Sequence, residues 1–157
     1  MDSRFDGIVS DAPSNSKKEE QWLTQEGNEV KKLIKVIEGN TQTMDKQIKA
    51  IMTEVNATVM EKKNKAIMET ISSTQDVINK AKSKLDTMAD TNKSLGQTNT
   101  AVMRENMHRS LTKQLIDTGT HFSLTNNNKK YYIYFIFPQK KRRRQKTLLY
   151  LNTLFFN

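Results

Sequence analysis

The sequence contains no cysteine and is poor in glycine and proline, with five and two residues in 157. Without cysteine, a disulfide framework and a thiolate metal site are both excluded. The scarcity of helix-breaking residues favours long helices. No stretch of about 18 apolar residues occurs, so we expect no transmembrane helix. The first 20 residues also lack the apolar segment of a secretory signal, and we therefore expect a cytoplasmic protein.

No arrangement of residues that is typical of catalysis or cofactor binding is present either. There is no glycine-rich phosphate loop, and the two histidines, His108 and His121, lack the four-residue spacing of a helical metal site. Most carboxylates lie beside lysines at helical spacing, where they form weak surface pairs. We therefore expect no enzyme activity, no cofactor, no metal and no small-molecule substrate.

The net charge of +9 is distributed very unevenly along the chain. Residues 123–157 hold eight basic residues and no acid, whereas residues 1–122 have a net charge of +1. The expected folded part therefore shows no electrostatic footprint for nucleic acid.

Residues 123–157 also differ from the rest of the chain in their clustered aromatic residues. The aromatic run Tyr131–Phe137 is too short to cross a bilayer. The basic run Lys140–Arg144 is compatible with a nuclear localisation signal or a nucleic-acid patch, and with peripheral contact to anionic lipid. Because most of these residue types have A/T-rich codons, the simplest interpretation is a non-globular tail made of translated non-coding sequence.

Local signals predict three helices. We expect residues 1–15 to form a flexible arm, because they lack a helical apolar pattern. Ser16 and Glu19 have the spacing of a capping box, which predicts the start of the first helix. This helix is predicted to end between Thr53 and Ala57.

The second helix is predicted to begin with another capping box, opened by Thr58, and to end at Gly96. Asn99 or Thr100 can cap the third helix, which is predicted to reach Phe122.

Apolar residues in the first two predicted helices recur at alternating spacings of three and four, and those of the third recur every four residues, which keeps one face of each helix toward its partners. The first stripe extends to Val55, and the third begins at Met103. Because short connections make neighbouring helices antiparallel, the sequence predicts an all-α, up-down-up three-helix bundle over residues 16–122. The predicted seam of this bundle consists of Val30, Ile34, Ile37, Met44, Ile48, Ile51, Ile67, Ile71, Ile78, Leu85, Met88, Leu95, Met107, Leu111 and Leu115.

The third predicted helix is about eleven residues shorter than the others, which is roughly 16 Å at a rise of 1.5 Å per residue. Its missing end would leave apolar side chains of the first two helices in water. We therefore expect the bundle to fray at that end. The side chains concerned are Met44, Ile48, Ile51, Met60 and Ile67.

Three stretches resemble the amino-terminal three-helix domain of the syntaxins, the target-membrane SNARE proteins of vesicle fusion. They are VKKLIKVIEGNTQTMDKQIKAIM, AKSKLDTM and RENMHRSLTKQLIDTGTHF. The third stretch is the most specific, because it matches a residue pattern of the family's third helix. The matching residues are Arg104, His108, Leu111, Leu115 and Phe122.

The resemblance implies a regulatory domain of intracellular vesicle transport and membrane fusion, located at the cytosolic face of endomembranes. Its implied partners are SNARE motifs and a Sec1/Munc18-type protein. The SNARE motif and the membrane anchor of the syntaxins are expected to be missing here. In the family, a short amino-terminal peptide binds the Sec1/Munc18-type protein, and Asp2, Arg4 and Ile8 are the candidates, without the usual adjacency.

Two other classes of function stay open. A helical-bundle or coiled-coil scaffold would self-associate through its seams. A nucleic-acid-binding or nuclear protein would act through the basic tail.

Overall fold

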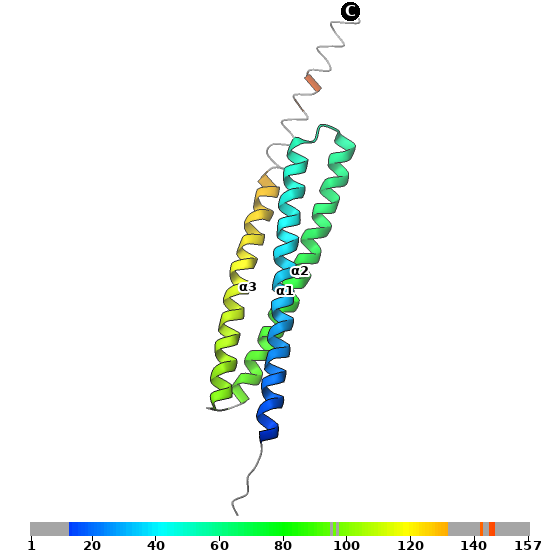
Figure 1. Ribbon diagram of the computed structural model, residues 1–157. Coiled ribbons are helices and arrows are strands. Elements are labelled where there is room, and N and C mark those ends of the chain that lie inside the picture. The colour runs from blue at the N-terminus through cyan, green and yellow to red at the C-terminus, as the bar shows by residue number, and fades with distance from the viewer. Residues whose placement is uncertain (1–12, 95, 97, 132–141, 143–144, 147–157) are drawn as a thin grey trace, which may run out of the picture.

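The chain forms three helices in up-down-up order that pack into one elongated bundle (Figure 1). The computed structural model describes residues 13–94, 96, 98–131, 142 and 145–146. Helix α1 spans Pro13–Thr53, α2 spans Ala57–Ser94 and α3 spans Asn99–Tyr131. The described residues contain no strand, and the predicted all-α three-helix bundle is confirmed.

Helix α1 begins at Pro13, three residues before the predicted capping box. Proline suits the first helical position, because its ring fixes φ near the helical value and no N–H is needed there. Ser16 therefore lies inside the first turns of α1 and does not begin the helix. Residues 1–12 of the predicted flexible arm lie outside the described residues.

The turn between α1 and α2 lies where it was predicted, but its cap is a different residue. The Oδ1 atom of Asn56 accepts hydrogen bonds from the backbone N–H groups of Thr58 and Val59, at 3.0 and 3.2 Å. Asn56 is thus the N-cap of α2, and the prediction of Thr58 was wrong. Thr58 is the second residue of the helix, where its own N–H needs an acceptor.

A carboxylate stabilises the same turn. Oε1 of Glu54 accepts the N–H groups of Val55 and Asn56, at 2.9 and 3.0 Å. Oε2 of Glu54 accepts a hydrogen bond from Nζ of Lys63 at 2.8 Å. These donors favour the ionised form, Lys63 most strongly, and lower the pKa of Glu54 to about 2.

The turn between α2 and α3 uses a glycine and a threonine. Gly96 has a φ of +62°, a left-handed conformation that glycine adopts without steric strain. Oγ1 of Thr98 accepts the N–H of Ala101 at 3.1 Å. Thr98 therefore caps α3, and neither Asn99 nor Thr100 does.

The core of the bundle is a single cluster from all three helices, and most of the predicted seam lies in it. Ile71 and Met107 are partly buried against it, Leu95 lies outside the described residues, and Val55 is 71% exposed in the turn rather than part of the first stripe. The buried members of the predicted seam are Val30, Ile34, Ile37, Met44, Ile48, Ile51, Ile67, Ile78, Leu85, Met88, Leu111 and Leu115.

Helix α3 continues nine residues past its predicted end. Phe122, Thr125 and Lys129 are buried at spacings of three and four, so the seam extends through them. The expectation that α3 leaves its neighbours exposed was therefore wrong. The side chains expected in water are all buried, namely Met44, Ile48, Ile51, Met60 and Ile67.

The buried face of α3 is also rotated from the predicted one. Met103 is 56% exposed, whereas Arg104 is only 3% exposed. Because Arg104 can form hydrogen bonds across the helices, it occupies the interior position and displaces the more apolar neighbour.

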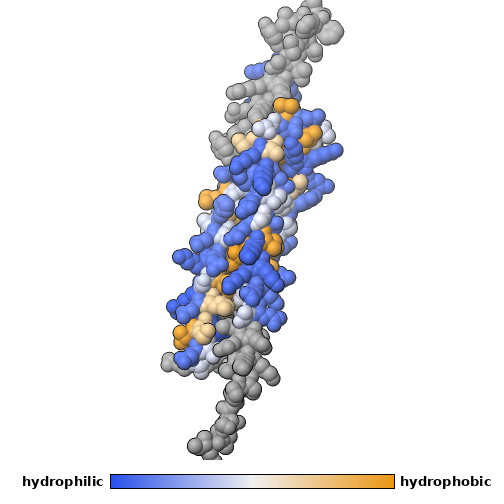
Figure 2. All heavy atoms as spheres, in the orientation of Figure 1, coloured by the Kyte–Doolittle hydropathy of each residue, from blue (hydrophilic) through white to orange (hydrophobic). Residues whose placement is uncertain are grey.

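The surface of the bundle is mainly polar, and Figure 2 shows hydrophilic side chains over most of the visible face, with small hydrophobic patches between them. None of the helices in the described part of the chain is apolar over enough of its length to cross a membrane.

Candidate functional site

A groove runs between α2 and α3, because these helices pack less extensively on each other than either does on α1. It contains a hollow of about 610 Å³. Its floor is apolar and formed by Ile78 and Leu85 of α2 and by Leu115 and Phe122 of α3. These four side chains are 4 to 6% exposed and belong to the hydrophobic core.

The rim of the groove combines polar residues with an exposed apolar one. Lys82 and Asp86 line it from α2, and Thr112 lines it from α3. Ile116 lies on the α3 side of the rim, and 61% of its surface is exposed. Gly119, about one turn later in α3, also lines the groove and has no side chain to fill it. This mixture suits the apolar stripe of a further amphipathic helix.

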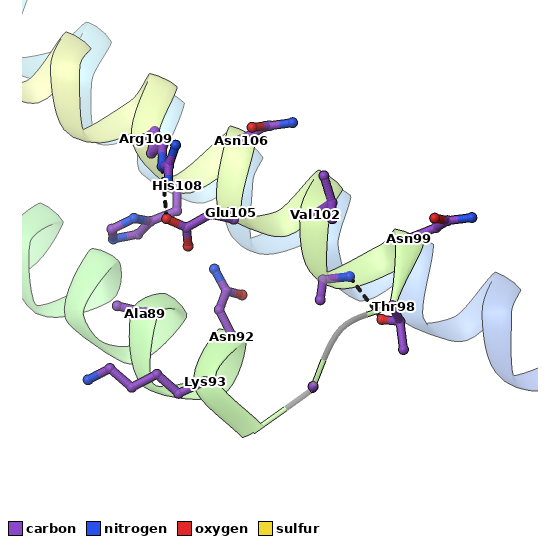
Figure 3. A pocket seen from close by; sticks show the side chains of 12 residues that line it. Ala89, Asn92, Lys93, Thr98, Asn99, Val102, Glu105, Asn106, His108 and Arg109 are labelled. Carbon is purple, nitrogen blue, oxygen red and sulfur yellow. Dashed lines mark hydrogen bonds and ion pairs between the residues drawn. The ribbon is translucent and has the colours of Figure 1, made fainter.

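A second hollow, of about 840 Å³, lies at the end of the groove beside the α2–α3 turn. Figure 3 shows Asn92 of α2 opposite Glu105 and His108 of α3. Nε of Arg109 donates a hydrogen bond to Oε1 of Glu105 at 2.9 Å. His108 lines both hollows, so they join into one surface.

Beneath this surface lies a polar layer that connects the three helices. Nε of Arg104 donates a hydrogen bond to Oδ1 of Asn92 at 2.9 Å. Burial raises the pKa of the Glu26 carboxyl of α1, while the positive charges of Arg104 and Lys84 act in the opposite direction.

An ion pair continues the polar layer toward solvent. Nζ of Lys84 lies 2.5 Å from Oε2 of Glu29. This hydrogen bond from Lys84 is the main cause of the lowered pKa of Glu29. The layer therefore links α1 to α2 as well as α2 to α3.

The residues of the syntaxin-like pattern lie on one side of α3. Arg104, Leu111, Leu115 and Phe122 are buried, and His108 is half-buried in the groove. The proposed partner-binding residues of the arm, Asp2, Arg4 and Ile8, lie outside the described residues.

Sequence reasoning missed the partnership of Asn92 with Arg104 and the nearby Glu26. The sequence did contain a sign of this contact, because Asn92 and Arg104 are polar residues at seam positions on the two sides of the α2–α3 turn.

Within the described part of the chain, no three histidine, cysteine, aspartate or glutamate side chains are close enough together to hold a metal ion. The chain matches no model of a known protein family and no curated protein sequence.

Proposed function

We propose that this chain is a partner-binding domain of SNARE-mediated vesicle traffic, which acts at the cytosolic face of endomembranes. The observation that carries the proposal is the open groove between α2 and α3, with its apolar floor and mixed rim. Soluble helical bundles use such grooves to bind the apolar stripe of an amphipathic helix.

The order and packing of the helices support the proposal. The up-down-up arrangement is the one that the resemblance to the syntaxin amino-terminal domain implies. Three residues of the matching pattern, Leu111, Leu115 and Phe122, contribute to the core beneath the groove.

The partner expected from this surface is a SNARE motif or a Sec1/Munc18-type protein that presents a helix. The two hollows extend along α2 from Gln75 to Lys93, which corresponds to about 27 Å at 1.5 Å per residue. A helix of about five turns would therefore be accommodated, with apolar residues at every third or fourth position.

A binding experiment with two matched variants tests the proposal. The full chain is titrated with SNARE-motif segments and with a Sec1/Munc18-type protein. Ile116→Asp places a charge on the rim of the groove and is expected to weaken binding at least about tenfold. Val36→Asp is the control, because Val36 is also exposed, at 46%, but lies on α1 and does not line the groove.

Absence of binding to both partners would reject the proposal, as would an equal loss in the two variants. A concentration-dependent oligomer in sedimentation, abolished by Ile116→Asp, would instead indicate a scaffold that associates through this groove. The proposal predicts a monomer.

A further inference from the structure

The topology of the bundle gathers positive charge at one of its ends. Because α2 runs antiparallel to its neighbours, the α1–α2 turn and the last turns of α3 lie at the same end (Figure 1). There, Nζ of Lys129 in α3 contacts Sδ of Met68 in α2. We call this the basic end, which comprises the described residues 44–68, 124–131, 142 and 145–146.

The two ends of the bundle differ strongly in charge. Residues 44–68 hold five lysines and three acids, and the described residues of 124–146 hold four basic residues, Lys129, Lys130, Arg142 and Lys146, and no acid. At the opposite end, residues 13–34 and 84–109 hold eight basic and seven acidic residues. The described residues of the basic end therefore carry a net charge of +6, compared with +1 at the opposite end.

Several cations of the basic end extend into solvent. Two of its three acids are already paired within the bundle, Asp45 with Lys49 at 2.7 Å and Glu54 with Lys63 at 2.8 Å. The exposed cations of the basic end are Lys46, Lys49, Lys62, Lys65, Lys130, Arg142 and Lys146, of which Lys49 is the one paired with Asp45.

Exposed apolar side chains accompany these cations. Val55 is 71% exposed in the α1–α2 turn, and Met52 is 43% exposed just before it. Hydrophobic patches are visible at the same end in Figure 2.

This combination favours a lipid surface over nucleic acid. Lysine and arginine contact phosphates in either partner. Exposed aliphatic side chains gain no favourable burial free energy beside the sugar-phosphate backbone of a nucleic acid. In a membrane, they insert at the boundary between headgroups and acyl chains, where their apolar surface is buried.

We propose that the basic end of the bundle binds the surface of an anionic membrane, with its lysines on the headgroups and Val55 and Met52 at the interface. This surface is separate from the groove between α2 and α3. A bundle attached in this way would keep that groove accessible to a protein partner.

Vesicle flotation of the full chain tests the proposal, with phosphatidylcholine vesicles that contain or lack phosphatidylserine. We expect binding only to the anionic vesicles and weaker binding as ionic strength rises. Lys62→Gln/Lys65→Gln should lower the partition coefficient by about 25-fold, or roughly fivefold for each lysine. Val55→Ser should weaken binding without a change in net charge.

The matched control is Lys31→Gln/Lys32→Gln, which removes the same charge from two exposed lysines of the opposite end and should leave binding unchanged. If the first pair alters helix content, Lys46→Gln/Lys130→Gln repeats the test on α1 and α3. The proposal would be overturned by equal binding to both vesicle types or by an equal loss in the control. Unchanged binding of the basic-end variants, or tighter binding to duplex DNA or RNA at equal phosphate concentration, would overturn it as well.

Discussion

Arg104 donates a hydrogen bond to Asn92 across 2.9 Å and so ties α3 to α2 inside the seam of the bundle. With 3% of its surface exposed, the guanidinium lies where a core residue is expected. Polar contacts in heptad seams are best known for fixing the register of helices. A shift of α3 by one turn would separate Arg104 from Asn92 and place the charge among apolar side chains, which disfavours the shifted packing.

The first prediction concerns this pair. Arg104→Leu should destabilise the bundle by about 2–4 kcal/mol, because Asn92 loses its donor and Glu26 loses a nearby positive charge. Adding Asn92→Leu should recover part of the loss, since the unpaired acceptor is removed. Urea denaturation of the two single variants and the double variant measures the coupling. Strictly additive losses would show that the two side chains do not act as a pair.

The second prediction concerns the buried lysine of α3. Lys129 is 5% exposed, and burial followed by the charge of Lys130 lowers its pKa. Lys129→Met should therefore stabilise the bundle by about 1–2 kcal/mol at neutral pH. The exposed neighbour provides the control, since Lys130→Met should change stability little.

The pH dependence of the Lys129 effect has a definite sign. The folded-state pKa lies below 10.5, so the buried charge destabilises the protein fully at pH values below that lowered pKa. As the pH rises through the lowered pKa toward 10.5, Lys129 loses its proton in the folded state first. The stability advantage of Lys129→Met should shrink over this range, and a constant advantage would contradict the assignment.

A third prediction concerns acid stability. The pKa of Glu54 is lowered from 4.5 to about 2, so its ionised form stabilises the α1–α2 turn. This contribution is complete above pH 4.5 and is lost as the pH falls toward about 2. Glu54→Gln should be less stable than the parent at pH 7, and the difference should disappear near pH 2. Asp90→Asn, which alters the exposed pair with Lys93, should have little effect at either pH.

The fourth prediction uses two glycines of α1 in opposite surroundings. A Cβ at Gly39 would meet no atom within 4 Å. Gly39→Ala should therefore raise the free energy of unfolding by about 0.5–1 kcal/mol, because alanine favours the helix. At Gly27 a Cβ would clash with Sδ of Met107, so Gly27→Ala should gain less or lose stability. Thermal unfolding of both variants measures the difference, and equal gains would show that the contact with Met107 adapts without loss.

The faces of α1 and α2 could be predicted because their buried positions are mostly isoleucine, valine, leucine and methionine at heptad spacing. The face of α3 could not. Its buried positions include Arg104, Thr118, Thr125 and Lys129, residue types that usually lie at the surface. A search for apolar stripes therefore selects Met103 over Arg104 and ends the helix at Phe122.

The candidate site was less predictable than the helices. Its groove depends on how far apart α2 and α3 pack, which no periodicity within one helix reveals. The hydrogen bond between Asn92 and Arg104 joins residues twelve positions apart across a turn. In the sequence, each of the two is only a polar residue near an apolar stripe, and the packed bundle is needed to show that they are hydrogen-bonded to each other.

The polar seam of α3 has a consequence for the order in which the bundle assembles. α1 and α2 share most of the aliphatic core and are joined by a turn of three residues, so their contacts form with little loss of chain entropy. α3 has the weakest separation of polar and apolar faces among the three helices. The α1–α2 hairpin should therefore act as one cooperative unit that forms first, and α3 should dock late and detach first. Amides of α3 would then exchange with solvent faster than those in the middle of α1, and this mobile helix forms one wall of the groove.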